Sequence, residues 1–213
     1  VVAKNNLVYN NTDNYIGTTV TGNAALANTQ EGVELSGVAN VVIGTSGHGN
    51  VISGNGYAGV NGFLNGSTGT KIQGNKIGVG ADGTTALGNA ASAAEGGISF
   101  RAANSGWLIG GTGVGEGNII ANNSGDGVSL STVNGTSNDI AVIGNSIYAN
   151  TGLAVDHADN GVTVNDAGDG DAGVRQGGGG AAGGHQLEAE ADQPAGHLQT
   201  GHLVAVGQRE EHA

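Results

Sequence analysis

A short phrase, Asn-x-(Val/Ile)-x-x-Asn, recurs along this chain and constrains its fold more than any other feature. Copies begin at Asn6, Asn50, Asn118 and Asn145, and a fifth copy opens with Thr at Thr70. A short strand between turn-forming residues, repeated at intervals of about 20 to 50 residues, is typical of a solenoid. The chain is therefore expected to stack coils on one another and not to close around a single globular core.

Other segments complete each coil. Two Gly-apolar-x-apolar units, 32–35 and 97–100, are each followed by a further apolar run, 41–43 and 107–109. With the repeated phrase, these segments predict three short strands per coil. The pattern of residues 14–28 also reappears at 75–89, which indicates a larger repeat superimposed on the coils. The long loops, about 17–31 and 78–96, are expected to emerge on one side of the stack in alternate coils.

The corner residues suit tight turns between such strands. Gly and Asn tolerate positive φ, and an Asn amide at equivalent corners of stacked coils can hydrogen-bond to the coils above and below. Strand alternation predicts inward apolar and outward polar side chains. We expect one inward column at the shared position of the phrase, and we expect Ser53 to point outward. That column comprises Val8, Ile52, Ile72, Ile120 and Ile147.

Composition agrees with a narrow apolar core and excludes several function classes. The chain has 44 Gly, 37% hydrophobic and only 3% aromatic residues, and a formal net charge of −12. It has no Cys, and no apolar run long enough for a membrane span. Cations are too few to neutralise phosphates, so a nucleic-acid partner is not expected. Polyuronates are disfavoured for the same reason unless Ca²⁺ bridges them.

The chain divides into two parts. Residues 1–173 carry the repeats, and we expect them to be part of a longer solenoid, with further coils or β domains in the native chain. Residues 174–213 lack Asn and Ile and contain the one Pro, with no recurring phrase. They are expected to be an unstructured Gly/Ala/His-rich tail, either linker-like or the product of reading a gene out of frame.

The repeats resemble secreted bacterial β-helix repeat proteins of the pectate-lyase-like superfamily. The resemblance rests on residues 50–55, 75–78, 153–156 and 159–169. It implies an all-β fold, a single-stranded right-handed parallel β-helix, and an extracellular or cell-surface location. The superfamily contains lyases, hydrolases, epimerases and adhesin stalks, so the fold does not determine the function.

One weak catalytic candidate comes from polygalacturonase-like members. They pair an Asn-Thr-Asp phrase with paired aspartates and a Gly-His-Gly, and here Asp13 and His48 occupy the first and last of these elements. The paired aspartates between them are absent, although inverting glycoside hydrolysis needs two converging carboxylates. Residues 47–49 also align with 115–117, so a turn is the favoured interpretation of them.

The second weak candidate and a metal site lie near the end of the repeats. Asp156 and His157, with Asp159, loosely resemble the Asp-Pro-His-Asp phrase of alginate-modifying β-helices, but the Pro is missing and no Arg is near. Further on, three carboxylates on a Gly-rich loop have the ligand type that Ca²⁺ prefers, and a plain solvated turn is the alternative. These carboxylates are Asp166, Asp169 and Asp171.

Two functions follow from these observations. The first is a repeat scaffold that contacts carbohydrate, such as a cell-surface glycan, or another surface through its long loops. The alternative is a polysaccharide lyase, hydrolase or epimerase whose catalytic coils lie outside this chain. An enzyme should cluster titratable side chains on the outward positions of one coil. The bland outward Ser, Thr, Asn and Gly residues favour the scaffold.

Overall fold

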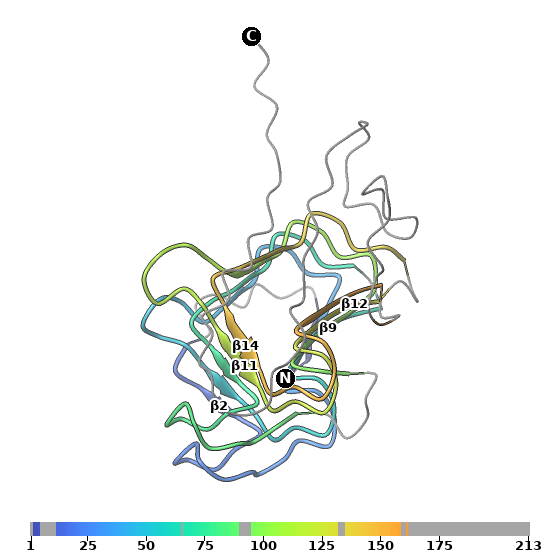
Figure 1. Ribbon diagram of the computed structural model, residues 1–213. Coiled ribbons are helices and arrows are strands. Elements are labelled where there is room, and N and C mark those ends of the chain that lie inside the picture. Colours follow the sequence, from blue (N-terminus) through green and yellow to red (C-terminus); the bar gives the residue numbers. More distant parts are fainter. Residues whose placement is uncertain are drawn as a thin grey trace.

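The computed structural model describes residues 2–4, 12–64, 66–89, 95–131, 135–158 and 161, and these residues form three parallel sheets (Figure 1). Sheet A has six strands in the order β1 (Val2–Lys4), β3 (Val33–Ser36), β6 (Val60–Phe63), β9 (Ile98–Arg101), β12 (Val128–Ser131) and β15 (Val155–Ala158). Sheet B has the order β13 (Ala141–Ile143), β10 (Leu108–Gly110), β7 (Lys71–Ile72) and β4 (Val42–Ile43). Sheet C has the order β14 (Ser146–Tyr148), β11 (Ile119–Ala121), β8 (Lys76–Ile77), β5 (Val51–Ile52) and β2 (Tyr15–Ile16).

From β3 to β15 the chain visits sheets A, B and C in turn and then returns to sheet A beside its previous strand. One such passage is called a coil below. All pairings between neighbouring coils are parallel and join equivalent residues, as in Val60 with Ile98 and Ile98 with Val128. The predicted all-β, solenoid-like stack with three strands per coil is therefore confirmed. Within the described part of the chain, no helix is long and apolar enough to cross a membrane.

The core runs along the inside of the stack because each strand points alternate side chains inward. Sheet C contributes the inward row Ile16, Ile52, Ile77, Ile120 and Ile147. Sheet B contributes the inward row Ile43, Ile72, Ile109 and Val142. The expected single column was thus wrong at Ile72, which lies in sheet B, while Ile77 takes the sheet C position. Val8 lies outside the described residues.

Two asparagine ladders explain the recurring phrase. Among the described residues, an Asn precedes each sheet C strand, and its Nδ2 and backbone N–H both donate to Oδ1 of the Asn in the next coil, at 2.8–3.0 Å. This ladder comprises Asn14, Asn50, Asn75, Asn118 and Asn145. The predicted stacking of Asn amides between coils is confirmed.

The second ladder lies where the chain leaves sheet C for sheet A. Its Nδ2 to Oδ1 distances are 2.8–3.0 Å, and its members are Asn28, Asn55, Asn89, Asn123 and Asn150. The phrase therefore reads as a first-ladder Asn, a core Ile and a second-ladder Asn. In the coils that contain β2 and β8, a hairpin separates the core Ile from the second Asn. The Thr70 copy contains a sheet B strand, so it does not hold the same position in the coil as the other described copies, which contain sheet C strands.

Long loops emerge in alternate coils, as predicted. The hairpins of residues 17–28 and 78–89 follow β2 and β8, and they contact each other through a hydrogen bond from the Ala81 N–H to the Gly22 carbonyl, 2.9 Å. A second pair of loops, 44–49 and 110–117, precedes β5 and β11, and Ser46 Oγ donates to the Val114 carbonyl at 2.6 Å. Both loop pairs border sheet C (Figure 1).

The 78–89 hairpin changes the environment of one outward residue. Ser53 points away from the core but is fully buried, because its hydroxyl donates to the Val79 carbonyl, 2.7 Å, and accepts from the Gly78 N–H, 3.0 Å. Its outward direction was predicted, but its burial was not. Residues 174–213 lie outside the described residues, so the prediction of an unstructured tail stays a prediction.

Candidate functional site

The outer face of sheet A carries a continuous row of polar side chains. The row alternates with the inward apolar residues and runs Glu34, Asn61, Ser99, Ser129 and Asp156 across five paired strands. All but Glu34 are buried, although they point away from the core. A buried polar row on an outer face differs from an ordinary solvated strand, and its hydrogen-bonding partners therefore need to be accounted for.

The two long loops that follow sheet C each end in a glutamate beside this row. Glu31 precedes β3, and its Oε1 accepts a hydrogen bond from Asn61 Nδ2, 3.0 Å. Glu95 precedes β9, and its Oε1 forms an ion pair with the Arg101 guanidinium at the end of that strand. Loops and strands of successive coils thus bring Glu31, Asn61, Glu95 and Arg101 together, and these four residues are called the sheet A cluster.

Two oxygen atoms of the sheet A cluster have no hydrogen-bond partner among the described residues. They are Asn61 Oδ1 and Glu95 Oε2, and their residues are 0% and 4% exposed. Leaving a buried acceptor without a donor costs about 1–3 kcal/mol, so such atoms are uncommon unless a ligand supplies the donor. The cluster therefore holds two unused acceptors, one of them on the carboxyl group that pairs with the Arg101 guanidinium.

The surroundings of Glu95 change the pKa of its carboxyl group. Burial raises the pKa of the Glu95 carboxyl, and the nearby Glu31 carboxylate raises it further, while the Arg101 charge works in the opposite direction. Burial is the largest of these influences. Glu95 is thus a carboxyl group that carries its proton to a higher pH than an ordinary glutamate, as expected of groups in binding and catalytic sites.

The cluster joins titratable groups of different coils, which the bland outward pattern of the single coils does not reveal. Glu31 and Glu95 are far apart in the sequence, and only the stacking of the coils places them on the same face. One signal was present in the sequence, because both glutamates end a long loop, Glu31 two residues and Glu95 three residues before a sheet A strand.

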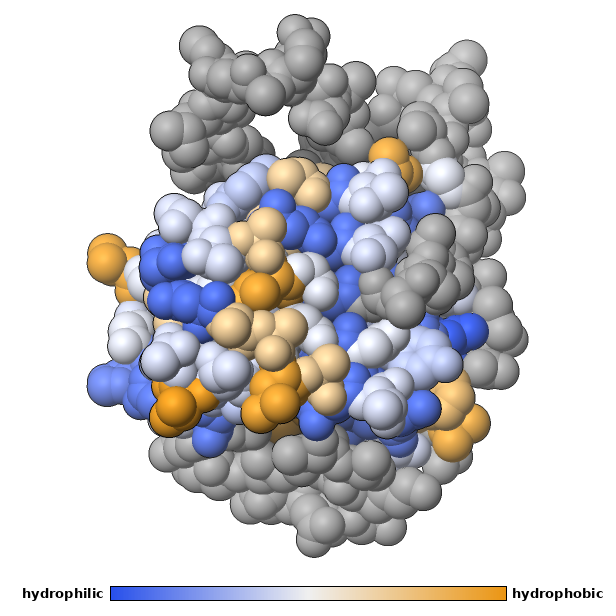
Figure 2. Space-filling view, turned by 90° about the horizontal axis from the view of Figure 1, so that it is seen from below, coloured by the Kyte–Doolittle hydropathy of each residue, from blue (hydrophilic) through white to orange (hydrophobic). Residues whose placement is uncertain are grey.

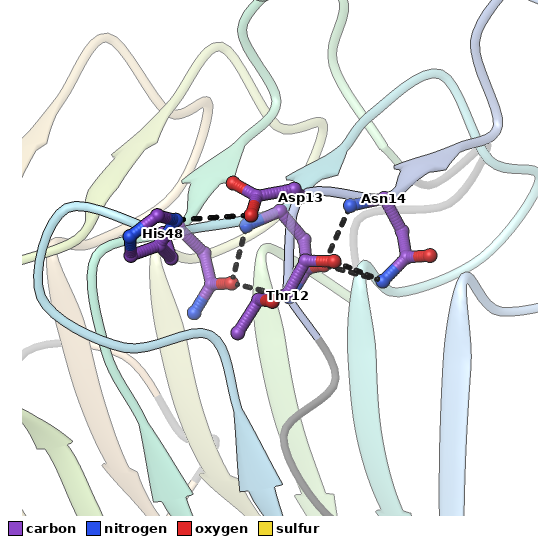
Figure 3. A network of polar contacts seen from close by, with 6 residues as sticks. Thr12, Asp13, Asn14 and His48 are labelled. Carbon is purple, nitrogen blue, oxygen red and sulfur yellow. Dashed lines mark hydrogen bonds and ion pairs between the residues drawn. The ribbon is translucent and has the colours of Figure 1, made fainter.

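The structure brings Asp13 and His48 together, as their motif requires. His48 Nδ1 lies 3.0 Å from Asp13 Oδ2, between the corner before β2 and the 44–49 loop (Figure 3). Both side chains are exposed, at 68% for His48 and 61% for Asp13, so water competes with the pair and its stabilising contribution is small. The two side chains form a pair without the second converging carboxylate that glycoside hydrolysis needs.

Asp156 and His157 do not share a face. They are consecutive residues of β15, so their side chains point to opposite sides of sheet A. Asp156 belongs to the buried outer row, and its Oδ2 accepts from the Gly161 N–H at 2.9 Å. His157 pairs with the inward-facing Leu130. This geometry separates the two groups that the alginate-modifying motif would need to act together, and Asp159 lies outside the described residues.

The expected calcium ligands Asp166, Asp169 and Asp171 also lie outside the described residues. Among the residues that the structure does describe, no three His, Asp or Glu side chains are arranged to hold a metal ion. The calcium site therefore stays a prediction.

Comparisons with protein-family models, with curated proteins and with solved structures find no match to this chain. The likeness to the pectate-lyase-like superfamily rests on the sequence motifs and on the stacked parallel sheets.

Proposed function

We propose that this chain is a secreted or cell-surface scaffold of the pectate-lyase-like type, a right-handed parallel β-helix that binds carbohydrate at the sheet A cluster. The parallel strands with their cyclic order of sheets A, B and C support this fold, because crossovers between parallel strands are right-handed in nearly all proteins. The recurring phrases support the family assignment.

The two unpartnered buried acceptors in the sheet A cluster carry the functional part of the proposal. Both acceptors are covered by protein atoms in this structure, so a sugar reaches them only when the surrounding side chains move aside. One sugar residue then offers several hydroxyl donors within a few ångströms. Arg101 supplies donors for a ring or hydroxyl oxygen in the same place. The long loops take part directly, because they deliver Glu31 and Glu95.

The charge of the cluster selects among carbohydrates. Two glutamates face one arginine, so an anionic polymer would be repelled unless a cation bridged it, whereas a neutral glycan would not. Neutral polysaccharides are therefore the expected ligands, and polyuronates are expected to need calcium.

The proposal is tested by affinity electrophoresis of the folded protein in gels that contain neutral or acidic polysaccharides, with and without calcium. Glu95→Gln and Asn61→Ala should each weaken retardation by a neutral polysaccharide. Asp139→Asn is the matched control, because Asp139 is an exposed residue before sheet B, and Asn tolerates its positive φ of 54°. Equal retardation of all four proteins would contradict the proposal.

The alternative is a polysaccharide hydrolase or lyase, and the raised pKa of the Glu95 carboxyl favours it. A carboxyl group of raised pKa near a second carboxyl group is the arrangement that general acid and base catalysis uses. Release of reducing ends and of unsaturated products should be measured on neutral and acidic polysaccharides with calcium. We expect background values, and turnover that is lost in Glu95→Gln but kept in Asp139→Asn would favour the enzyme.

A further inference from the structure

Tyr15 presents an aromatic ring on the outer face of sheet C. It is the first residue of β2, and because the next residue, Ile16, points into the core, Tyr15 points outward. Its side chain is 48% exposed, although the chain is poor in aromatic residues and Phe100 and Trp107 are buried. An aromatic ring left half in water, in a chain with few aromatics, is typical of a binding surface.

The hairpin of residues 17–28 holds this ring in place. Gly22 has a φ of +71°, and a Cβ atom built there would lie 2.4 Å from Tyr15 Cε1 and 2.6 Å from the Cβ atom of Ala81. The backbone at Gly22 therefore lies directly against the ring, and Ala81 of the 78–89 hairpin lies beside it. One edge of the Tyr15 ring is fixed by packing. A ligand that stacks on the ring therefore causes little loss of side-chain conformational entropy.

Two polar side chains lie at the N-terminal end of the sheet C strands, where Tyr15 begins β2. Asp13 is two residues before Tyr15, and it is joined to His48 through Asp13 Oδ2 and His48 Nδ1 (Figure 3). That contact leaves Asp13 Oδ1 and His48 Nε2 on two exposed side chains. A carboxylate oxygen accepts hydrogen bonds, and an imidazole nitrogen donates or accepts according to its tautomer.

Apolar side chains continue the surface along the same hairpin. Val20 and Leu26 are 88% and 69% exposed. Figure 2 shows hydrophobic side chains among hydrophilic ones on the face of the molecule that is seen from below. The surface therefore combines a fixed ring, scattered apolar side chains and a pair of hydrogen-bonding groups.

We propose that Tyr15, Asp13 and His48 form a stacking subsite for one neutral sugar residue of a glycan. A pyranose ring has a face of C–H groups surrounded by hydroxyl groups. The C–H face packs on the electron-rich face of the Tyr15 ring, and the adjacent hydroxyls reach Asp13 and His48. The Asp13 carboxylate disfavours a uronate, so the ligand is an uncharged sugar.

This subsite is separate from the sheet A cluster. It lies on sheet C, before the 17–28 hairpin, whereas Glu31 lies after that hairpin at the start of sheet A. The inference therefore goes beyond the proposed function and does not depend on Glu95 or Asn61. A glycan that engaged both surfaces would gain affinity by avidity.

The test measures depletion of the protein from solution by insoluble cellulose, mannan and xylan, with variants at two exposed tyrosines. Tyr15→Ala should weaken binding to at least one of these by about tenfold, since one ring face is lost, while Tyr15→Phe keeps the ring and should bind like the wild type. Tyr148→Ala is the matched control, because Tyr148 also points outward from sheet C and is 47% exposed. Thermal unfolding of each variant checks that it is folded.

The outcomes separate this inference from the proposed function. Loss of binding in Tyr15→Ala, with Tyr148→Ala and Glu95→Gln unaffected, supports the subsite. Loss in Glu95→Gln alone overturns the subsite and leaves the sheet A proposal standing. Binding by Tyr15→Ala equal to that of the wild type, or no binding of the wild type to any of the three polymers, also overturns the subsite.

Discussion

Substitution of Asn118 by Ala tests whether the asparagine ladders hold the coils together. Asn118 lies in the middle of the first ladder, and the residue is 1% exposed. Its Oδ1 accepts from both the backbone N–H of Asn75, 2.9 Å, and Asn75 Nδ2, 3.0 Å. Its Nδ2 donates to the Ile72 carbonyl and to Asn145 Oδ1, both at 2.8 Å.

The expected cost follows from these four bonds. Each intramolecular hydrogen bond contributes about 1 kcal/mol net, so their loss should lower the free energy of unfolding by about 4 kcal/mol. Two backbone groups, the Asn75 N–H and the Ile72 carbonyl, would also lose a partner in a buried place. Domains are stable by only about 5–15 kcal/mol, so this single change removes a large part of the total.

Urea denaturation followed by tryptophan fluorescence measures the effect. The chain has one tryptophan, Trp107, which is 1% exposed in the core, and its Nε1 donates to the Ser67 carbonyl at 3.0 Å. With a urea dependence of about 1–3 kcal/mol per molar, the midpoint should fall by about 2 M.

Asn138→Ala is the control for this measurement. Asn138 is partly exposed, and its Nδ2 makes one contact, 3.3 Å to the Thr136 carbonyl, so its loss should cost less than about 0.5 kcal/mol. If Asn118→Ala unfolded within about 1 kcal/mol of this control, the ladder would not be a source of cohesion between coils.

Three further predictions follow from the structure and the sequence. Thr70→Val should raise the free energy of unfolding by about 1 kcal/mol in the same urea assay, because the fully buried Thr70 hydroxyl has no hydrogen-bond partner; a loss of stability would show that it has one. The pKa of Glu95 is raised in the folded state, so stability should be greatest below the unfolded pKa of about 4.5 and should fall as pH rises through the folded pKa. Glu95→Gln should remove this fall, and an unchanged pH profile of the unfolding midpoint would contradict the assignment. Millimolar calcium should raise the melting temperature if the predicted acidic loop binds the ion. Substitution of all three aspartates by Asn should abolish this increase. A melting temperature that does not change with calcium would contradict the calcium site. The aspartates are Asp166, Asp169 and Asp171.

The asparagine ladders at the corners between strands could be predicted from the sequence, because each corner is formed by nearby residues and recurs in successive coils. An Asn that recurs at the same position of a short phrase needs only the neighbouring coil to complete its hydrogen bonds, so the ladders follow from the spacing. The alternating long loops follow in the same way, from the repetition of residues 14–28 at 75–89.

Assignment to a sheet could not be made from the phrase alone. Strands of two residues carry too little pattern to distinguish sheet B from sheet C, so the segment that begins at Thr70 has the same pattern as the phrase at Asn50. Pairing between coils decides the question. Ile72 pairs with Ile43 and Ile109 in sheet B, while Ile77 pairs with Ile52 and Ile120 in sheet C.

The sequence by itself determined the repeat, the corners and the apolar interior, since each depends on residues within one coil and on its repetition. Only the tertiary structure decided which polar groups meet. Strand alternation sends Asp156 and His157 to opposite faces, although they are neighbours in sequence. Coil stacking brings Glu31 and Glu95 to one buried face from separate loops, because contacts between coils depend on loop lengths and register that no local pattern specifies.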